Sequence, residues 1–219
     1  ARGGSKGIKN KNIVNIGGSP LIQYTIDAAL KSKMLSDCIV STDSDEITKV
    51  AKLCGAIVPF KRPELLSNDQ ALSLPVIQHA VDFMEDYKSL LYDYVLMLQP
   101  TTPLRQAEDI DSAINLLIDS DADSVISVVD VQGYHPLRMK RIVDGRLINY
   151  VDQGYENMKP RQNLPHVYIR NGAIYATRRN TLMIENSFTG NNSRAYIMSS
   201  DRSVNIDTPQ DLILAKSYF

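Results

Sequence analysis

The stretch YVLMLQPTTPLRQAEDIDSAINLLIDSDADSVISVV, residues 94–129, decides the fold class. It begins with a continuous apolar run, YVLML at 94–98, which predicts a strand buried on both faces. AEDIDSAINLLIDS at 107–120 then predicts a helix, and SVISVV at 124–129 predicts a second strand. A strand, a helix and a further strand in this order are typical of a parallel sheet with helices packed against it.

The same alternation continues on both sides of this unit. Strands are predicted at 38–42, 56–60, 172–177 and 195–199, and helices at 19–33, 44–55, 73–87, 179–186 and 208–219. Ser19, Ser44 and Thr208 are the candidate N-cap residues of three of these helices, with proline following Ser19 and Thr208. We therefore predict an α/β fold, an open and mostly parallel sheet with helices on both faces.

The alternation stops between residues 133 and 168. This segment has scattered Tyr, Pro, Gly and Arg, and VDGRLI at 143–148 predicts a hairpin that turns at Asp144-Gly145. We expect a β-rich excursion at 133–168, inserted into an α/β core made of residues 1–132 and 169–219.

Composition excludes several classes of function. The net charge is −1, so no overall positive field attracts nucleic acid, and no apolar run reaches the length of a membrane-spanning helix. Cys38 and Cys54 lie in apolar contexts without disulfide or metal-binding spacing, which predicts two buried thiols. Free thiols of this kind indicate a reducing cytoplasm.

Positive charge is concentrated in ARGGSKGIKNKN, residues 1–12. Its glycines permit close approach of the backbone to a ligand, and its cations suit a triphosphate with an accompanying metal ion. The pattern is neither the P-loop nor the dinucleotide-binding fingerprint. Phosphate binding is the favoured interpretation, and an unstructured cationic segment is the alternative.

Five motifs in order resemble one family. ARGGSKGIKNKN is followed by RPELLSND at 62–69, LQPTTPLR at 98–105, PRQNLP with NGAIY within 160–175, and NIDTPQDL at 205–212. Together they are similar to the CMP-sialic acid synthetases, the acylneuraminate cytidylyltransferases. The resemblance implies a Rossmann-like domain of the nucleotide-diphospho-sugar transferase type and a small dimerisation subdomain, here 133–168. It also implies a Mg²⁺-dependent reaction of CTP with a nine-carbon α-keto sugar acid, which gives the CMP-sugar and pyrophosphate.

The resemblance assigns nucleotide-binding roles by motif. Matching positions for the nucleotide are Arg2, Ser5, Lys6, Lys11, Asn12, Arg62, Ala71 and Ser73. Arg2 and Lys11 are the catalytic candidates among them, with Lys11 stabilising charge as pyrophosphate leaves. Asp207 is the third catalytic candidate and the main Mg²⁺ ligand. Asn205 occupies the second metal position, where the family often has an acid, so a second metal site should be weak or absent.

Sugar-binding roles follow from the later motifs. The matching positions are Gln99, Thr101, Arg138, Arg161, Asn171, Tyr175 and Phe188. Arg138 and Arg161 are candidate partners of the sugar carboxylate, because the guanidinium fork binds carboxylates bidentately. Both lie in the excursion, which in the family reaches the partner subunit, so we expect a homodimer whose sites are completed by the second chain. Ser187 replaces one of two adjacent aromatic residues of the family, which leaves the preferred acyl group open.

Three alternatives remain. A CMP-Kdo type transferase shares the phosphate loop, and a non-catalytic nucleotide-binding homologue is suggested by Asn205. A glycosyltransferase is suggested by STDSDE at 41–46, although Ser44 and Asp45 also suit a helix start. Among nine-carbon acids, N-acetylneuraminate, legionaminate and pseudaminate are all open, with KGIKNKN favouring a legionaminate-like sugar.

A phosphate-binding loop in a doubly wound sheet usually follows its first, central strand. We therefore expect about five to six mostly apolar residues just before Ala1 in the native protein.

Overall fold

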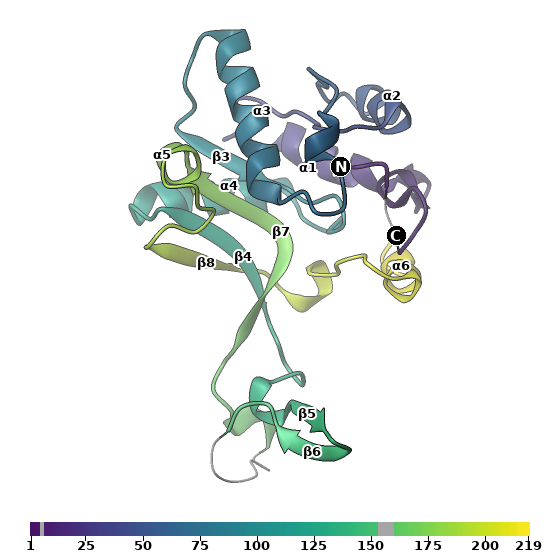
Figure 1. Ribbon diagram of the computed structural model, residues 1–219, viewed down its shortest axis with the longest axis vertical. Helices are drawn as coiled ribbons and strands as arrows, with labels where there is room; N and C mark the ends of the chain where they lie inside the picture. The colour runs from purple at the N-terminus through teal and green to yellow at the C-terminus, as the bar shows by residue number, and fades with distance from the viewer. Residues whose placement is uncertain (5–6, 153–159) are drawn as a thin grey trace.

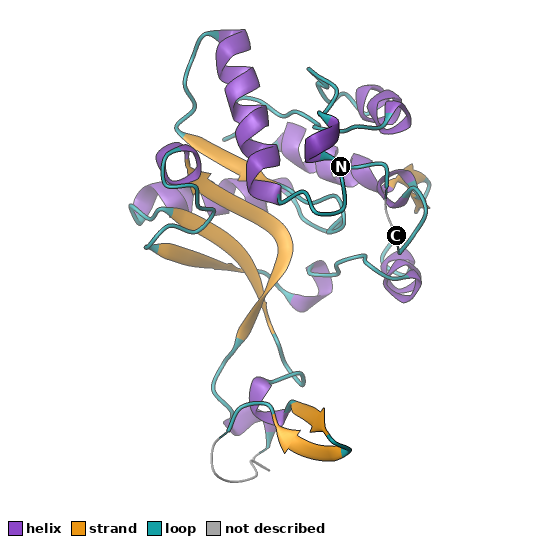
Figure 2. Ribbon diagram, viewed as in Figure 1, coloured by secondary structure: helices purple, strands orange, loops and turns teal. Residues whose placement is uncertain are grey.

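The computed structural model describes residues 1–4, 7–152 and 160–219. A four-stranded sheet lies at its centre, in the order β3 (Tyr94–Met97), β7 (Tyr168–Arg178), β4 (Ser124–Asp130), β8 (Ser193–Ile197) (Figures 1 and 2). β4 and β8 are parallel, whereas β7 is antiparallel to both β3 and β4. The sheet is therefore mixed, because the chain leaves β4, passes through the excursion and returns directly along β4 as β7.

Helices cover both faces of this sheet, as the alternation predicted. They are α1 (Leu21–Lys31), α2 (Asp45–Leu53), α3 (Ser73–Lys88), α4 (Ala107–Asp119), α5 (Arg179–Met183) and α6 (Pro209–Lys216). Short 3₁₀ helices are η1 (Lys11–Ile13), η2 (Glu64–Leu66), η3 (Pro136–Arg138), η4 (Arg161–Asn163) and η5 (Ser200–Arg202). α1 and α4 share the main core with the sheet, while α3 and α5 lie on the opposite face (Figure 1). None of the helices described could cross a bilayer.

Two of the three predicted helix starts are confirmed. Ser44 Oγ accepts a hydrogen bond from the backbone of Ile47 at 3.3 Å, and Thr208 forms a capping box with Asp211. Ser19 does not cap a helix. Gly17 and Gly18 both have positive φ, which produces a tight hairpin between β1 (Asn15–Ile16) and β2 (Ser19–Pro20), and α1 begins only at Leu21.

The predicted strands at 38–42 and 56–60 form only isolated parallel bridges. Ile39 pairs with Ile57, and Thr42 pairs with Lys61. The backbone N–H of Val40 donates to Ile57 O at 2.9 Å, which holds the two extended segments together. They pack on α1 and α2 through an apolar cluster that includes Ile22, Ile26 and Ile47. These segments therefore continue the α/β layer beside the four-stranded sheet.

The excursion projects from the core as the lower lobe of Figure 1. It contains the hairpin of β5 (Lys140–Val143) and β6 (Arg146–Asn149), which are antiparallel. Asp144 and Gly145 both have positive φ, so the predicted two-residue turn is confirmed. β4 and β7 pair along their length, from Ser124 to Asp130 of β4. The far end of this pair forms the neck that connects the excursion to the core.

Candidate active site

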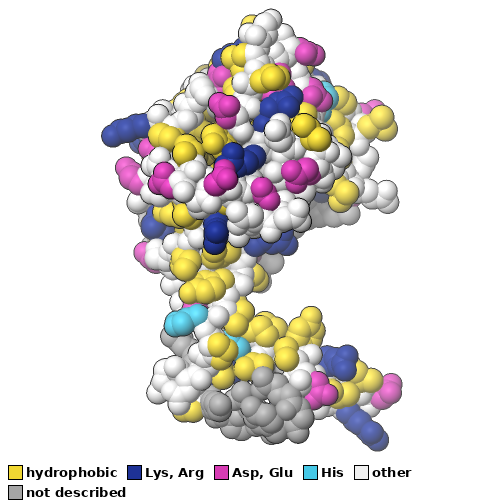
Figure 3. All heavy atoms as spheres, turned by 90° about the vertical axis from the view of Figure 1, so that its left-hand side faces the viewer, with side chains coloured by type: hydrophobic (Ala, Val, Ile, Leu, Met, Phe, Trp, Pro, Cys, Tyr) yellow, Lys and Arg dark blue, Asp and Glu magenta, His cyan; other side chains and the backbone are white. Residues whose placement is uncertain are grey.

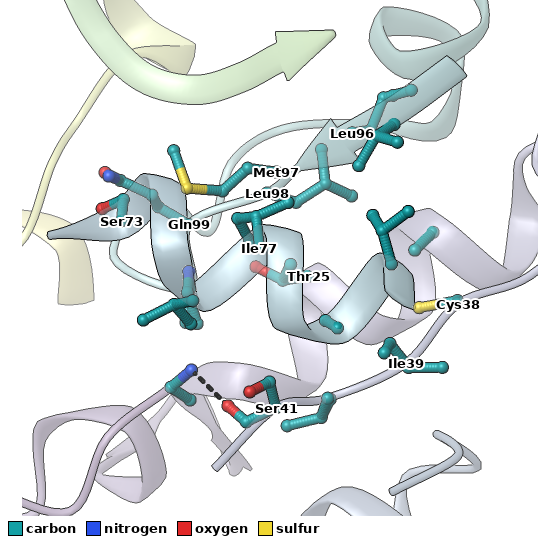
Figure 4. A pocket seen from close by; sticks show the side chains of 18 of the residues that line it. Thr25, Cys38, Ile39, Ser41, Ser73, Ile77, Leu96, Met97, Leu98 and Gln99 are labelled. Atoms are coloured by element: carbon teal, nitrogen blue, oxygen red, sulfur yellow. Dashed lines mark hydrogen bonds between the residues drawn. The ribbon is translucent and has the colours of Figure 1, made fainter. Parts of the chain in front are cut away.

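A cavity of about 960 Å³ lies between β3, α1, α3 and the extended segment at 38–41. One end, which we call the polar mouth, is lined by Arg2, Lys11, Asn12, Arg62, Asn68, Asp69, Ala71, Ser73, Gln99, Thr101 and Asp207. The rest, which we call the apolar slot, is lined by residues such as Ile22, Ile26, Cys38, Ile39, Val81, Leu96 and Leu98 (Figure 4). The polar mouth therefore collects predicted residues from four of the five motifs.

The opening loop is fixed against two distant segments. The backbone N–H of Gly3 donates to Asp43 Oδ1 at 3.0 Å, and Asn12 Nδ2 donates to the carbonyl of Arg2 at 3.0 Å. A Cβ atom on Gly7 would lie 2.5 Å from the carbonyl oxygen of Asp207. Gly7 is therefore needed because the loop passes directly over the backbone at Asp207. Ser5 and Lys6 lie outside the described residues.

Two guanidinium groups, those of Arg2 and Arg62, line the polar mouth. Arg2 Nη1 donates to Asn68 O at 3.0 Å and lies 2.8 Å from Asp69 Oδ1. Arg62 donates to Ser41 through Nε, at 3.0 Å from Oγ, and through Nη2, at 2.6 Å from the carbonyl oxygen. Burial, reinforced by the charge of Arg2, lowers the pKa of Arg62. The two guanidinium groups repel each other, and an anion bound in the mouth would relieve that repulsion.

Lys11 and Asp207 meet at the mouth from positions 196 residues apart. Lys11 Nζ lies 2.9 Å from Asp207 Oδ1 and donates at 2.9 Å to the carbonyl of Ile206. Asn205 Nδ2 donates to Asp207 Oδ2 at 2.6 Å. Asp207 thus presents an oriented, largely exposed carboxylate beside the mostly buried side chain of Lys11.

Asp211 holds the backbone that carries Asp207. Its Oδ2 accepts the N–H of Asp207 at 3.0 Å and that of Thr208 at 2.7 Å. Burial would raise the pKa of Asp211, but these hydrogen bonds outweigh it and lower the pKa. The sequence identified Thr208 as the cap and gave no role to Asp211, whose position three residues later is the signal for a capping box.

The donor groups at the polar mouth would suit a Mg²⁺ ion that the protein binds through few of its own side chains. The described part of the chain has no group of three His, Cys, Asp or Glu side chains that could bind a metal by themselves. Asp207 offers a carboxylate, and Asn205 Oδ1 is buried without a hydrogen-bond partner. Mg²⁺ usually takes one or two protein carboxylates and completes its shell with phosphate oxygens and water.

The turn at 99–102 is held by Ile206 and Arg105, to which the sequence motifs assigned no role. Thr101 O accepts the N–H of Ile206 at 2.8 Å, which ties this turn to the segment bearing Asp207. Arg105 is buried and donates to Thr102 O at 3.2 Å and to Thr25 Oγ1 at 2.8 Å. Burial lowers the pKa of Arg105 to about 10. The turn is therefore linked both to the segment that carries Asp207 and, through Arg105, to Thr25 of α1.

Several predicted sugar-binding residues are not among the described residues that line the polar mouth. Asn171 is buried, and its side chain bonds to Ser127 at 2.6 Å and Ser203 at 3.0 Å, which gives it an internal role instead of a substrate-facing one. The rings of Tyr175 and Phe188 lie side by side, 6.3 Å between centroids. Arg138 and Arg161 lie in the excursion, in η3 and η4.

Comparison with known proteins agrees with this geometry. The model of the cytidylyltransferase family matches residues 1–215. The chain is 37% identical to the N-acylneuraminate cytidylyltransferase of Streptococcus agalactiae serotype V, over 97% of this chain and 50% of that protein, so it spans about half of that relative's length. It is 33% identical to the CMP-N,N'-diacetyllegionaminic acid synthase of Campylobacter jejuni, over 96% of this chain and 88% of the relative.

A solved structure shares the fold. CMP:2-keto-3-deoxy-manno-octonic acid synthetase complexed with CTP superposes with a TM-score of 0.72 at 17% identity, covering 100% of this chain and 95% of the other. The family model spans nearly the whole chain, and its ends, at the opening loop and beyond Asp207, are the two segments that meet at the polar mouth. The chain therefore belongs to the cytidylyltransferase family.

Proposed function

We propose that this chain transfers CMP from CTP to a nine-carbon α-keto sugar acid, N-acetylneuraminate or a relative such as legionaminate. The observation that carries this proposal is the meeting of Lys11 and Asp207 beside Arg2 and Arg62 in one polar mouth. Three cations suit a triphosphate, and a carboxylate suits a metal ion and a hydroxyl nucleophile. Relatives that bear the names of sialate and legionaminate enzymes cover the same residues.

In the proposed reaction a sugar hydroxyl oxygen forms a bond to the α-phosphorus of CTP, and the bond to pyrophosphate breaks. Lys11 stabilises the negative charge that grows on the departing pyrophosphate. Asp207 is placed to accept the hydroxyl proton, or to bind Mg²⁺ with Asn205 as a neutral neighbour. Bound Mg²⁺ would supply charge neutralisation at the phosphates. Arg2, Arg62 and Asn12 position the nucleotide, with Ala71 and Ser73 beside it.

The sugar is proposed to bind at the side of the mouth formed by Gln99 and Thr101. A Cβ atom at Gly172 would lie 2.6 Å from Gln99 Oε1, so the side chain of Gln99 rests directly on the backbone of β7. Tyr175 pairs with Met97 at the end of β3, which brings its ring and that of Phe188 near this side. They form the apolar contact proposed for the acyl group.

The excursion at 133–168 is proposed to be a dimerisation subdomain that a second copy of this chain covers. Its hairpin exposes Ile142 by 76% and Leu147 by 70%, and Tyr150, which follows the hairpin, is exposed by 64%. Figure 3 shows apolar side chains gathered on the neck and on the side of the lobe nearest the core. A lone two-stranded hairpin is marginal in water, so these side chains need a partner surface. Arg138 and Arg161 would then approach the partner's polar mouth and its sugar carboxylate.

The reaction is tested by pyrophosphate release with CTP, Mg²⁺ and a panel of N-acetylneuraminate, legionaminate, pseudaminate and the eight-carbon Kdo. We expect turnover with at least one nine-carbon acid and little with Kdo. Preference for Kdo would favour a CMP-Kdo type transferase, and no pyrophosphate release with any acid would favour a non-catalytic homologue.

Both cysteines are free, which supports a cytoplasmic location.

The dimer is tested by sedimentation of the Leu147→Glu variant, with Leu53→Glu as the control. Leu53 is 87% exposed at the end of α2, on the surface of the α/β domain and outside the excursion. We expect Leu147→Glu to dissociate the dimer and to abolish turnover, and Leu53→Glu to do neither. A fully active monomer would refute a site completed by a second chain.

A further inference from the structure

The turn at 99–102 has few backbone donors of its own. Pro100 and Pro103 have no backbone N–H, and the N–H of Thr102 already donates to Gln99 O at 3.3 Å. Thr102 is fully buried, so its carbonyl oxygen needs a partner inside the protein. The conformation of this turn therefore depends on donors that other parts of the chain supply.

Arg105 supplies such donors through one buried guanidinium group. Its Nη1 donates to Thr102 O at 3.2 Å and to Gln99 O at 3.4 Å, and its Nη2 donates to Thr25 Oγ1 at 2.8 Å. Arg105 is only 3% exposed, and burial lowers its pKa, which the charge of Asp109 only partly offsets. Burial of a charge is unfavourable, so a position that only had to fill space would suit an apolar side chain better.

The turn that Arg105 holds carries Gln99 into the cavity. β3 runs directly into Gln99, whose side chain is among those that line the polar mouth (Figure 4). Thr102 Oγ1 donates to Asn171 O at 3.4 Å, and a Cβ atom on the next residue, Gly172, would lie 2.6 Å from Gln99 Oε1. The backbone of Gln99 is thus fixed by Arg105, and its side chain has little room to move against β7.

We propose that Arg105 is a positioning residue for sugar binding, because its guanidinium fixes the carbonyls of Gln99 and Thr102 and thereby sets where the Gln99 amide meets the sugar. The inference rests on the proposed function, in which Gln99 contacts the sugar. Arg105 is not among the described residues that line the cavity, so it acts only through Gln99. The planar fork of a guanidinium reaches two carbonyls and a hydroxyl at once, which the compact ammonium of lysine cannot do.

Two substitutions test this role at different strengths. Arg105→Met removes all three hydrogen bonds, whereas Thr25→Val keeps the shape of Thr25 and removes only the acceptor of Nη2. The measurements are KM for the sugar, KM for CTP and the melting temperature. We expect Arg105→Met to raise KM for the sugar by about tenfold or more, and Thr25→Val to raise it by about threefold. KM for CTP should change by less than about twofold in both variants.

Repeating both substitutions in a Gln99→Ala background separates positioning from general support of the fold. Without the Gln99 side chain, the effect on KM for the sugar should disappear, while the loss of melting temperature should persist. Arg179→Met is the matched control, because Arg179 also donates two hydrogen bonds, to Glu85 at 2.7 Å, and lies outside the cavity. It should lower the melting temperature and leave KM for the sugar unchanged.

The outcomes distinguish this inference from the proposed function. Turnover by the unmodified chain, with the same rise in KM for the sugar in both backgrounds or no rise in either, would overturn the positioning role alone. An equal rise in both KM values would do the same, because it would show general damage to the site. If Arg105→Met does not fold, the result with Thr25→Val decides. No turnover of any acid by the unmodified chain would refute the proposed function and this inference with it.

Discussion

Replacement of Asp207 by Asn separates the role of its charge from its role in the fold. The amide has the size of the carboxylate but cannot offer negative charge to Lys11 Nζ, 2.9 Å away, or to a metal ion. The side chain of Asp207 is 62% exposed, and exposed ion pairs contribute about 0–1 kcal/mol to stability. For a chain of this length, about 1 kcal/mol corresponds to about 2–4 °C in melting temperature. We expect a change no larger than this.

The effect on catalysis should be much larger. Loss of a general base typically lowers the rate by about 10²–10⁴, which corresponds to about 2.7–5.4 kcal/mol. The assay is pyrophosphate release with CTP, Mg²⁺ and the best sugar of the panel. Asp45→Asn is the matched control, because Asp45 also forms a 2.9 Å ion pair, with Lys61, and is 77% exposed outside the cavity. The control should melt like Asp207→Asn and keep full activity.

Two results would refute this reasoning. Turnover by Asp207→Asn within a few-fold of the unmodified chain would remove Asp207 from the catalytic machinery. A large loss of melting temperature, well beyond that of Asp45→Asn, would show that the carboxylate holds the fold, so that lost activity says nothing of the chemistry.

Three further predictions follow from individual contacts. Arg179 donates to both oxygens of the buried Glu85 at 2.7 Å, and these hydrogen bonds lower the pKa of Glu85. Their stabilisation is complete above the unfolded-state pKa and is lost as pH falls through the lower folded-state pKa. Glu85→Gln should therefore cost about 3 kcal/mol at pH 7 and progressively less in acid, as measured by denaturant melts from pH 7 to 3. Equal stabilities at pH 7 would contradict it. Gly172→Ala, at φ +79°, should cost about 1–2 kcal/mol and raise KM for the sugar by displacing Gln99, with KM for CTP as the control. Asn205→Asp should tighten Mn²⁺ binding without nucleotide by about tenfold in calorimetry, because it adds a second carboxylate to the mouth. Unchanged affinity would place Asn205 outside the metal site.

The elements of the fold follow largely from local sequence, whereas their pairing does not. Periodicity and caps predicted helices on both faces and the hairpin at Asp144-Gly145, because these features depend on neighbouring residues. The expected start of α1 at Ser19 was wrong because Gly17 and Gly18 create a turn that competes with a helix cap. The direction of β7 depends on how the excursion returns to the core, and no local pattern records that path.

In the candidate site too, the residues in contiguous motifs were predicted from the sequence, and those that depend on distant contacts were not. The loop at 1–12 and Asp207 were found because their motifs are contiguous in sequence. Arg105 was not assigned a role because its partners are backbone carbonyls and the hydroxyl of Thr25, 80 positions away, and neither leaves a pattern in the sequence. Asn171 sits within a motif, yet its buried contacts with Ser127 and Ser203 are visible only after folding.

The reversed direction of β7 explains where its contribution to the site lies. In a parallel sheet the ligand crevice lies at the carboxyl ends of the strands, as it does here for β3, which runs directly into Gln99. For β7 that rule points to Arg178, but Arg178 pairs with Tyr94 at the start of β3, at the end of the strands away from Gln99. Because β7 is antiparallel, its earlier residues reach the mouth, and Gly172 lies directly against Gln99. Substitutions that alter sugar preference should therefore act near Gly172 and Tyr175, and equivalent substitutions near Arg178 should leave it unchanged.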